Sequence, residues 1–163
     1  MGRRTASETQ LRPDPRFNDL VLARFINCVM KSGKKGPATR VVYDCLDVIQ
    51  QRLAQETSPE APKEAMDVFH RAIENVKPFV EVRSKRIGGA NYQVPMQVNK
   101  KRQQSLAFRW ILEATRGERG RPMAQRLADE FYAAAQGEGK AMQTRDQTHR
   151  MAEANRAFAH FAN

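Results

Sequence analysis

The chain has 163 residues, of which 40% are hydrophobic, enough for one domain with a single core. Its 28 lysines and arginines outnumber its 18 aspartates and glutamates, which gives a net charge of +10. An excess of this size indicates a polyanionic partner, most often nucleic acid and less often an anionic membrane surface. No apolar run approaches the length of a membrane span, and the polar N-terminus has no secretory signal, so we expect no membrane partner and a cytoplasmic location.

The residues that usually carry chemistry are few and scattered. The two cysteines, Cys28 and Cys45, lack the spacing of a metal or redox pair and stand within apolar helical patterns. We expect both to be small buried residues in a reducing cytosol, and not a disulfide. The three histidines, His70, His149 and His160, show no metal-ligand spacing, and the sequence supports no pairing of a nucleophile with a base. We therefore expect no enzymatic activity, no metal and no cofactor.

The apolar residues recur with helical periodicity and predict about six helices. Their expected ranges are 19–31, 37–54, 62–77, 101–116, 122–136 and 140–159. Asp19 is expected to cap the first of them. Residues 1–18 carry no period and are expected to form a flexible tail, basic at Arg3 and Arg4. The rest, residues 19–163, is expected to be a single helical domain.

One segment between the third and fourth helices, residues 79–98, is typical of β structure. Apolar and polar residues alternate on both sides of Gly88-Gly89, and two glycines supply the positive φ angles of a tight hairpin. Pro95 has no N–H to donate, so it is expected on an open edge. We therefore predict a mainly α fold with a protruding two-stranded antiparallel β-ribbon. Because two strands alone are marginally stable, the ribbon should pack on helices or meet a partner.

The basic residues gather at the ends of elements, where few carboxylates neutralise them. The clusters are Arg3-Arg4, Lys31 with Lys34-Lys35, Arg83 with Lys85-Arg86, Lys100-Lys101-Arg102, and Arg116 with Arg119 and Arg121. We expect them to contact phosphates, the alternative for Lys34-Lys35 being a solvated turn. Tyr92 either stacks on a base or packs across the ribbon on Ile87 or Val82. Scattered loop contacts favour folded RNA, and a generic basic DNA-binding protein is the alternative.

Several stretches of the chain follow the sequence of a known family in the same order. They are residues 74–78, 80–95 and 148–160, supported by 14–17, 33–35 and 107–110. Together they resemble the bacterial-type small-subunit ribosomal protein seven family over nearly the whole chain. The resemblance implies a structural role: primary binding to the 3′ major domain of 16S rRNA, nucleation of the 30S head, and a position at the subunit interface near the exit-site tRNA.

The resemblance also implies partners and further contact residues. The expected protein neighbours are ribosomal proteins nine and eleven of the small subunit, in a bacterium or a bacterial-type organelle, with no self-association. Five residues join the basic clusters as expected rRNA contacts, namely Arg109, His149, Arg150, Asn155 and Arg156. The ribbon is expected to place its base on rRNA and its tip near the tRNA. The tip residues are Gly88, Gly89, Ala90, Asn91 and Tyr92.

Overall fold

A computed structural model describes residues 10–56 and 62–162 of the chain. These residues form six α-helices, a two-stranded antiparallel sheet and a short 3-10 helix. The α-helices are α1 (Leu20–Val29), α2 (Lys35–Gln55), α3 (Ala65–Val76), α4 (Lys100–Arg116), α5 (Met123–Ala135) and α6 (Lys140–Ala154). The strands are β1 (Val80–Ile87) and β2 (Ala90–Gln97), and the 3-10 helix is η2 (Arg156–Ala162). The predicted mainly α fold with a ribbon between the third and fourth helices is confirmed.

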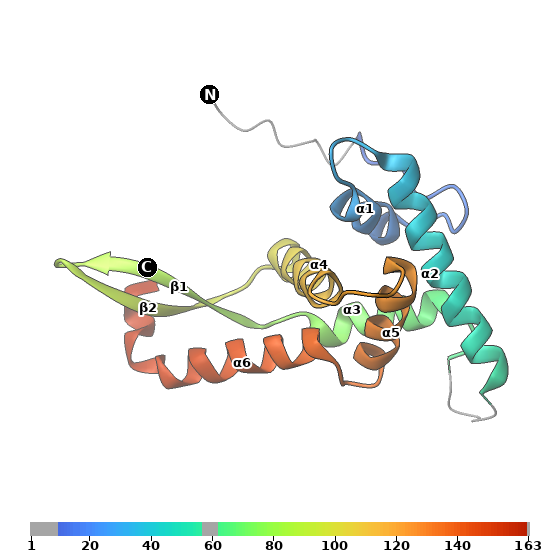
Figure 1. Ribbon diagram of the computed structural model, residues 1–163. Coiled ribbons are helices and arrows are strands. Elements are labelled where there is room, and N and C mark those ends of the chain that lie inside the picture. Colours follow the sequence, from blue (N-terminus) through green and yellow to red (C-terminus); the bar gives the residue numbers. More distant parts are fainter. Residues whose placement is uncertain (1–9, 57–61, 163) are drawn as a thin grey trace.

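Figure 1 shows the arrangement: α1 to α5 make a helical body, and the ribbon projects from it with α6 running alongside. Four buried phenylalanines meet inside the body. The ring centroid of Phe25 lies 5.3 Å from those of Phe108 and Phe131, and that of Phe69 lies 5.2 Å from Phe131. Tilted and edge-to-face aromatic pairs stabilise a core beyond the area they bury. This packed core fixes the helices of the body, and the helices in turn position the loops between them.

Local signals explain where helices begin and end. The Asp19 carboxylate accepts the N–H of Leu22 at 2.7 Å and caps α1 as predicted. The predicted end of the last helix was wrong: this helix was expected over residues 140–159, but α6 ends at Ala154. The side chain of Asn155 donates to the carbonyl of Met151 at 2.8 Å and competes with the helical backbone, after which the chain continues as η2. None of the described helices is both long and apolar enough to cross a membrane.

Part of the segment expected to be a tail is packed against α2. Asp14 is buried, and its carboxylate accepts the N–H groups of Arg16 and Phe17 at 3.0 Å and the hydroxyl of Tyr43 at 2.7 Å. The ring of Phe17 meets that of Tyr43 edge-on at 6.1 Å. These bonds satisfy a carboxylate that would be costly to bury alone. Arg3 and Arg4 lie outside the described residues.

The prediction for the two cysteines was right for one of them. Cys45 is buried, and burial raises the pKa of its thiol. Cys28 is exposed, although it stands in an apolar stretch of α1. The buried stripe of that helix is Leu22, Ala23, Phe25, Ile26 and Val29, and Cys28 falls outside it. Both thiols are free.

The ribbon turns at Gly88-Gly89, whose φ angles of 56° and 88° are the positive values that a two-residue hairpin requires. The strands pair from Ile87 with Ala90 to Val80 with Gln97. The N–H of Val98 donates to the carbonyl of Phe79 at 3.2 Å. Phe79 and Val98 are therefore a hydrogen-bonded pair, and hydrogen-bonded pairs alternate with non-hydrogen-bonded pairs along an antiparallel ribbon. By this alternation Val82 and Pro95 are a non-hydrogen-bonded pair, in which the backbone nitrogen of Pro95 points away from β1. Pro95 thus faces an open edge, as predicted.

Helical segments cover one face of the ribbon. The register places Tyr92, opposite Lys85, on the same face as the fully buried Val94. The ring of Tyr92 packs on Phe158 and Phe161 of η2, with centroids 5.2 and 5.3 Å apart, and Lys85 Nζ donates to the carbonyl of Phe161 at 2.7 Å. We call Tyr92, Phe158 and Phe161 the aromatic clasp. The ribbon therefore packs on the protein, through a contact with η2 that the sequence did not suggest.

Candidate nucleic-acid interface

A groove lies between the loop that follows α1 and the loop that joins α4 to α5. Its volume is about 600 Å³. Its lining includes five cations and a single carboxylate, namely Lys31, Lys34, Arg116, Arg119 and Arg126 with Glu118. We call this surface the basic groove. Two clusters that are far apart in the sequence, around residues 31–35 and 116–121, are therefore one surface in the fold.

The loop after α1 is a tight turn that presents its lysines to solvent. Ser32 and Gly33 adopt left-handed φ angles of 52° and 71°, and the N–H of Lys34 donates to the carbonyl of Lys31 at 3.0 Å. Lys31 and Lys34 are exposed, as is Lys35 at the start of α2. Within the described residues none of these three lysines forms an ion pair. Their charge is therefore available to an external anion.

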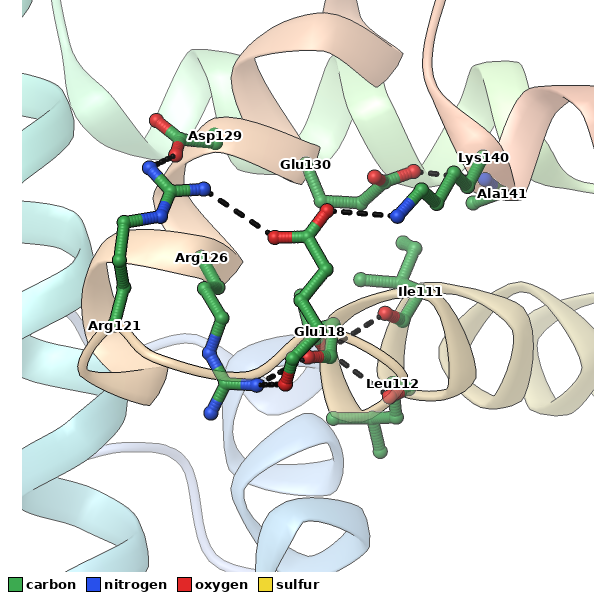
Figure 2. A network of polar contacts seen from close by, with 10 residues as sticks. Ile111, Leu112, Glu118, Arg121, Arg126, Asp129, Glu130, Lys140 and Ala141 are labelled. Atoms are coloured by element: carbon green, nitrogen blue, oxygen red, sulfur yellow. Dashed lines mark hydrogen bonds and ion pairs between the residues drawn. The ribbon is translucent and has the colours of Figure 1, made fainter.

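The other wall of the groove is fixed by Arg126 of α5. Figure 2 shows its guanidinium reaching the backbone of the loop, where Nη1 donates to the carbonyl of Thr115 at 2.8 Å and to that of Glu118. The hydroxyl of Thr115 in turn donates to the carbonyls of Ile111 and Leu112 at 3.0 Å or less. Arg126 is thus a structural support of the loop. Arg116 acts similarly, donating to the carbonyl of Val29 at 3.1 Å and joining α4 to the end of α1.

The one carboxylate in the groove lining is neutralised by other residues. Glu118 accepts from Lys140 Nζ at 2.8 Å and from Arg121 at 3.3 Å, and Figure 2 shows its carboxylate between these two cations. The hydrogen bond from Lys140, followed by that from Arg121, lowers the pKa of Glu118. Arg121 also donates to Asp129 at 2.7 Å. Arg121 is therefore engaged within the protein, while Arg119 remains exposed with no ion pair inside the described part of the chain.

The basic residues at the base of the ribbon are arranged differently. Glu81 is only 6% exposed and accepts from Arg83 Nε at 2.8 Å and from Arg102 Nη2 and Nε at 3.0 and 3.1 Å. Burial acts to raise the pKa of Glu81, but the hydrogen bonds from Arg102 and Arg83 outweigh it and lower the pKa. Of these two predicted RNA contacts, Arg102 therefore ties the start of α4 to β1, while Arg83 pairs with Glu81 within β1.

The remaining predicted contacts differ in their exposure and in what their side chains bind. Three side chains bind neighbouring residues: Lys85 contacts η2, Asn155 contacts α6, and Arg156 lies 3.5 Å from Glu153. Five cations are exposed at various places, namely Arg86, Lys100, Lys101, Arg109 and Arg150.

At the hairpin tip Gly88 to Asn91 are exposed, whereas Tyr92 is half-buried. His149 is half-buried too, and its Nε2 accepts the N–H of Phe79 at 3.2 Å.

Two residues that organise these surfaces were missed from the sequence. Arg126 lies inside a helix, outside every basic cluster, and nothing local marks it as a loop support. Glu81 did carry a signal, because residues two apart on a strand share a face, which placed its carboxylate beside Arg83.

The sequence of the chain is similar to known proteins over almost its whole length. The family described as "Ribosomal protein S7p/S5e" matches residues 1–156. "Small ribosomal subunit protein uS7" of Rhodopirellula baltica is 57% identical over 162 residues, which covers 99% of each chain. The protein of the same name from an Acidovorax species is 50% identical over 159 residues, covering 98% of this chain and 97% of the relative. That of Thermotoga maritima is 48% identical over 161 residues, or 99% of each.

Proposed function

This chain belongs to the ribosomal protein S7p/S5e family, and we propose that it is a structural, non-enzymatic constituent of the small ribosomal subunit that binds rRNA through its basic groove. The observation that carries the proposal is the set of exposed cations around the groove, Lys31, Lys34 and Arg119, which form no ion pair within the described residues. Cations that are free of carboxylates are the groups that neutralise RNA phosphates and release counterions.

The mechanism that we propose is architectural. The bound RNA is the 3′ major domain of 16S rRNA, at a place where several of its helices converge. Phosphates that approach one another repel, and a fixed set of cations between them lowers the free energy of bringing the helices together. Because Arg116 and Arg126 hold the two loops of the groove in place, little ordering of the protein is needed on binding. Binding would in this way nucleate assembly of the 30S head.

The ribbon supplies a second contact surface in this proposal. Its base lies on rRNA, and its tip, residues 88–92, faces the exit-site tRNA at the subunit interface. The projection of the ribbon from the helical body supports this division (Figure 1). Since the ring of Tyr92 is occupied by the aromatic clasp, the tip would meet the tRNA through the exposed residues Gly88 to Asn91. The protein neighbours would be ribosomal proteins nine and eleven.

The test of rRNA binding is a competition titration at matched salt. A fragment of the 3′ major domain of 16S rRNA and a DNA duplex of equal length compete for the full-length protein. We expect the RNA to bind more tightly by an order of magnitude or more, as its shape is recognised in addition to its charge. Equal affinity would favour a generic basic DNA-binding protein. Loss of the chain from small ribosomal subunits during a high-salt wash would contradict a structural role in the ribosome.

The role of the tip is tested by shortening the ribbon. Removing the outermost pair, Ile87 and Ala90, together with the pair of Arg86 and Asn91, leaves Gly88-Gly89 to close the hairpin. The reference is Arg86→Gln in the full-length ribbon, which accounts for the loss of that cation. We expect binding to rRNA to change little and retention of tRNA in the exit site to decrease. If binding to protein-free rRNA collapses, the tip contributes to assembly and the proposed division of the ribbon is wrong.

A further inference from the structure

Phe79 is an aromatic side chain that the helical core does not use. It immediately precedes β1 and is 73% exposed. The other exposed large hydrophobic residues of the described chain, Leu20 and Met151, are 47% and 45% exposed. A single exposed apolar residue is common in proteins and needs no special explanation. Phe79 differs because the structure around it fixes the position of the ring.

His149 of α6 holds Phe79 in two ways. Its imidazole stacks on the phenyl ring, with centroids 6.0 Å apart and planes 26° from parallel. Its Nε2 also accepts the backbone N–H of Phe79 at 3.2 Å, which places the imidazole proton on Nδ1. Burial, followed by the charge of Arg145, lowers the pKa of His149, and this keeps the imidazole neutral and Nε2 an acceptor. The carbonyl of Phe79 is fixed as well, because it accepts the N–H of Val98.

The result is an aromatic ring supported on one face by His149 and largely open to solvent. The two residues that bind the backbone of Phe79, His149 and Val98, each have an exposed cation near them in the sequence. Arg150 follows His149, and Lys100 is two residues after Val98. Within the described residues neither cation forms an ion pair. Aromatic rings beside cations that can bind phosphate are typical of sites for single-stranded nucleic acid, where every base has a π face to stack.

We propose that Phe79 is a stacking platform for one unpaired nucleobase of RNA, with His149 as the residue that positions it. The inference rests on the proposed function, since it names a specific contact with the rRNA. A protein partner fits less well, because the core of a protein interface is an apolar patch depleted of charge, whereas the segments that hold this ring carry the exposed cations Arg150 and Lys100. The base would be an unstacked one, in a loop or bulge, because a base inside a helix is stacked on both faces.

The test compares Phe79→Ala with wild-type protein in titrations against a 3′ major domain rRNA fragment at several salt concentrations. We expect roughly a tenfold loss of affinity, as stacking on an aromatic side chain typically contributes this much. The dependence on salt should stay unchanged, because no phosphate contact is lost. Met151→Ala is the matched control: it removes another exposed apolar side chain of the described residues and should change affinity less than twofold. Thermal unfolding of both variants shows that they fold.

A second variant, Phe79→Trp, gives a readout that affinity alone does not. Its affinity should remain near that of the wild type, and its tryptophan emission should be quenched by RNA, whereas Trp110 is only 9% exposed and serves as the background. Unchanged affinity of Phe79→Ala, or absence of quenching, would overturn the proposal. So would normal RNA binding by Phe79→Ala combined with loss of a neighbouring ribosomal protein, since the ring would then serve a protein partner. If the wild-type protein itself fails to bind the fragment, the proposed function fails first and this inference fails with it.

Discussion

The basic groove and the base of the ribbon contain the same kinds of residue, yet they differ in what their charges contact. At the ribbon base the carboxylate of Glu81 is almost buried between Arg83 and Arg102. In the groove the carboxylate of Glu118 is held by Lys140 and Arg121, and Lys31 and Lys34 form no ion pair within the described residues. The first arrangement stabilises the fold and the second leaves positive charge for a ligand. The charge of a basic cluster is therefore most available to a ligand where no carboxylate of the fold pairs with it.

The largest expected effect comes from removing the exposed charges of the groove. In a variant with Lys31→Gln, Lys34→Gln and Arg119→Gln, each charge loss removes about one phosphate contact, so we expect affinity for the rRNA fragment to fall roughly 10- to 100-fold. The slope of log affinity against log salt should become shallower by about 2 to 3. Filter binding at several salt concentrations measures both.

The control for this variant is Arg83→Gln at the ribbon base. Because Arg83 is paired with Glu81, its loss should change the salt slope much less than the triple substitution does. If the two variants reduce the slope of log affinity against log salt equally per charge removed, the cations of the ribbon base are as available to RNA as those of the basic groove, which contradicts the distinction.

The next largest effect is expected on stability, from Glu81→Gln. The substitution leaves Arg83 and Arg102 without their common counter-ion at a site that is 6% exposed. Breaking a fully buried pair costs more, but both arginines are partly exposed, so we expect a loss of about 1–2 kcal/mol in the free energy of unfolding. Urea denaturation measures it. The control is Glu153→Gln, which alters an exposed pair with Arg156 and should change the free energy of unfolding little. Equal losses in the two variants would show that the ion pairs of Glu81 contribute no more to stability than an exposed pair does.

A smaller and more local effect is expected from Tyr92→Ala, which removes the central ring of the aromatic clasp. We expect a loss of about 1 kcal/mol, confined to the contact between the ribbon and η2. Amide hydrogen exchange should become faster in residues 156–162 and remain unchanged in α1 to α5. Faster exchange in the helical body would mean that the clasp is part of the global folding unit.

The smallest effect concerns pH. The folded protein holds the pKa of Glu81 below its ordinary value of about 4.5, so the unfolded chain binds this proton more readily. The resulting stability is fully present above that ordinary value and is lost as pH falls through the lower pKa of the folded state. The advantage of wild-type protein over Glu81→Gln should therefore begin to shrink as pH falls below about 4.5 and shrink further in stronger acid. A constant difference between pH 7 and pH 3 would contradict this assignment.

Much of the fold could be predicted because its signals are local. The cap at Asp19, the turn at Gly88-Gly89 and the edge position of Pro95 each follow from the chemistry of one or two residues. The end of α6 was placed too late because the competing bond of Asn155 is a matter of side-chain geometry. The packing of residues 14–17 was missed because it depends on Tyr43, which is distant in the sequence.

The candidate site was predicted in composition but not in arrangement. The sequence identified Lys31, Lys34 and Arg119 as basic residues at element ends. It did not indicate that they line one groove, because that depends on how α4 packs against α1 through Arg116. Nor did it separate engaged cations from available ones, since a residue such as Arg121 is neutralised by Asp129 through the tertiary fold.

The contact between the ribbon and η2 has a consequence for the order of folding during synthesis. Lys85 and Phe161, which form one of its bonds, are 76 residues apart in the chain. A hairpin closes within microseconds, but a ribosome adds only about 5–20 residues per second. The two strands therefore exist for several seconds before the residues of η2 are made, and an isolated pair of strands is only marginally stable. During this interval the nascent ribbon has open edges that could pair with other chains.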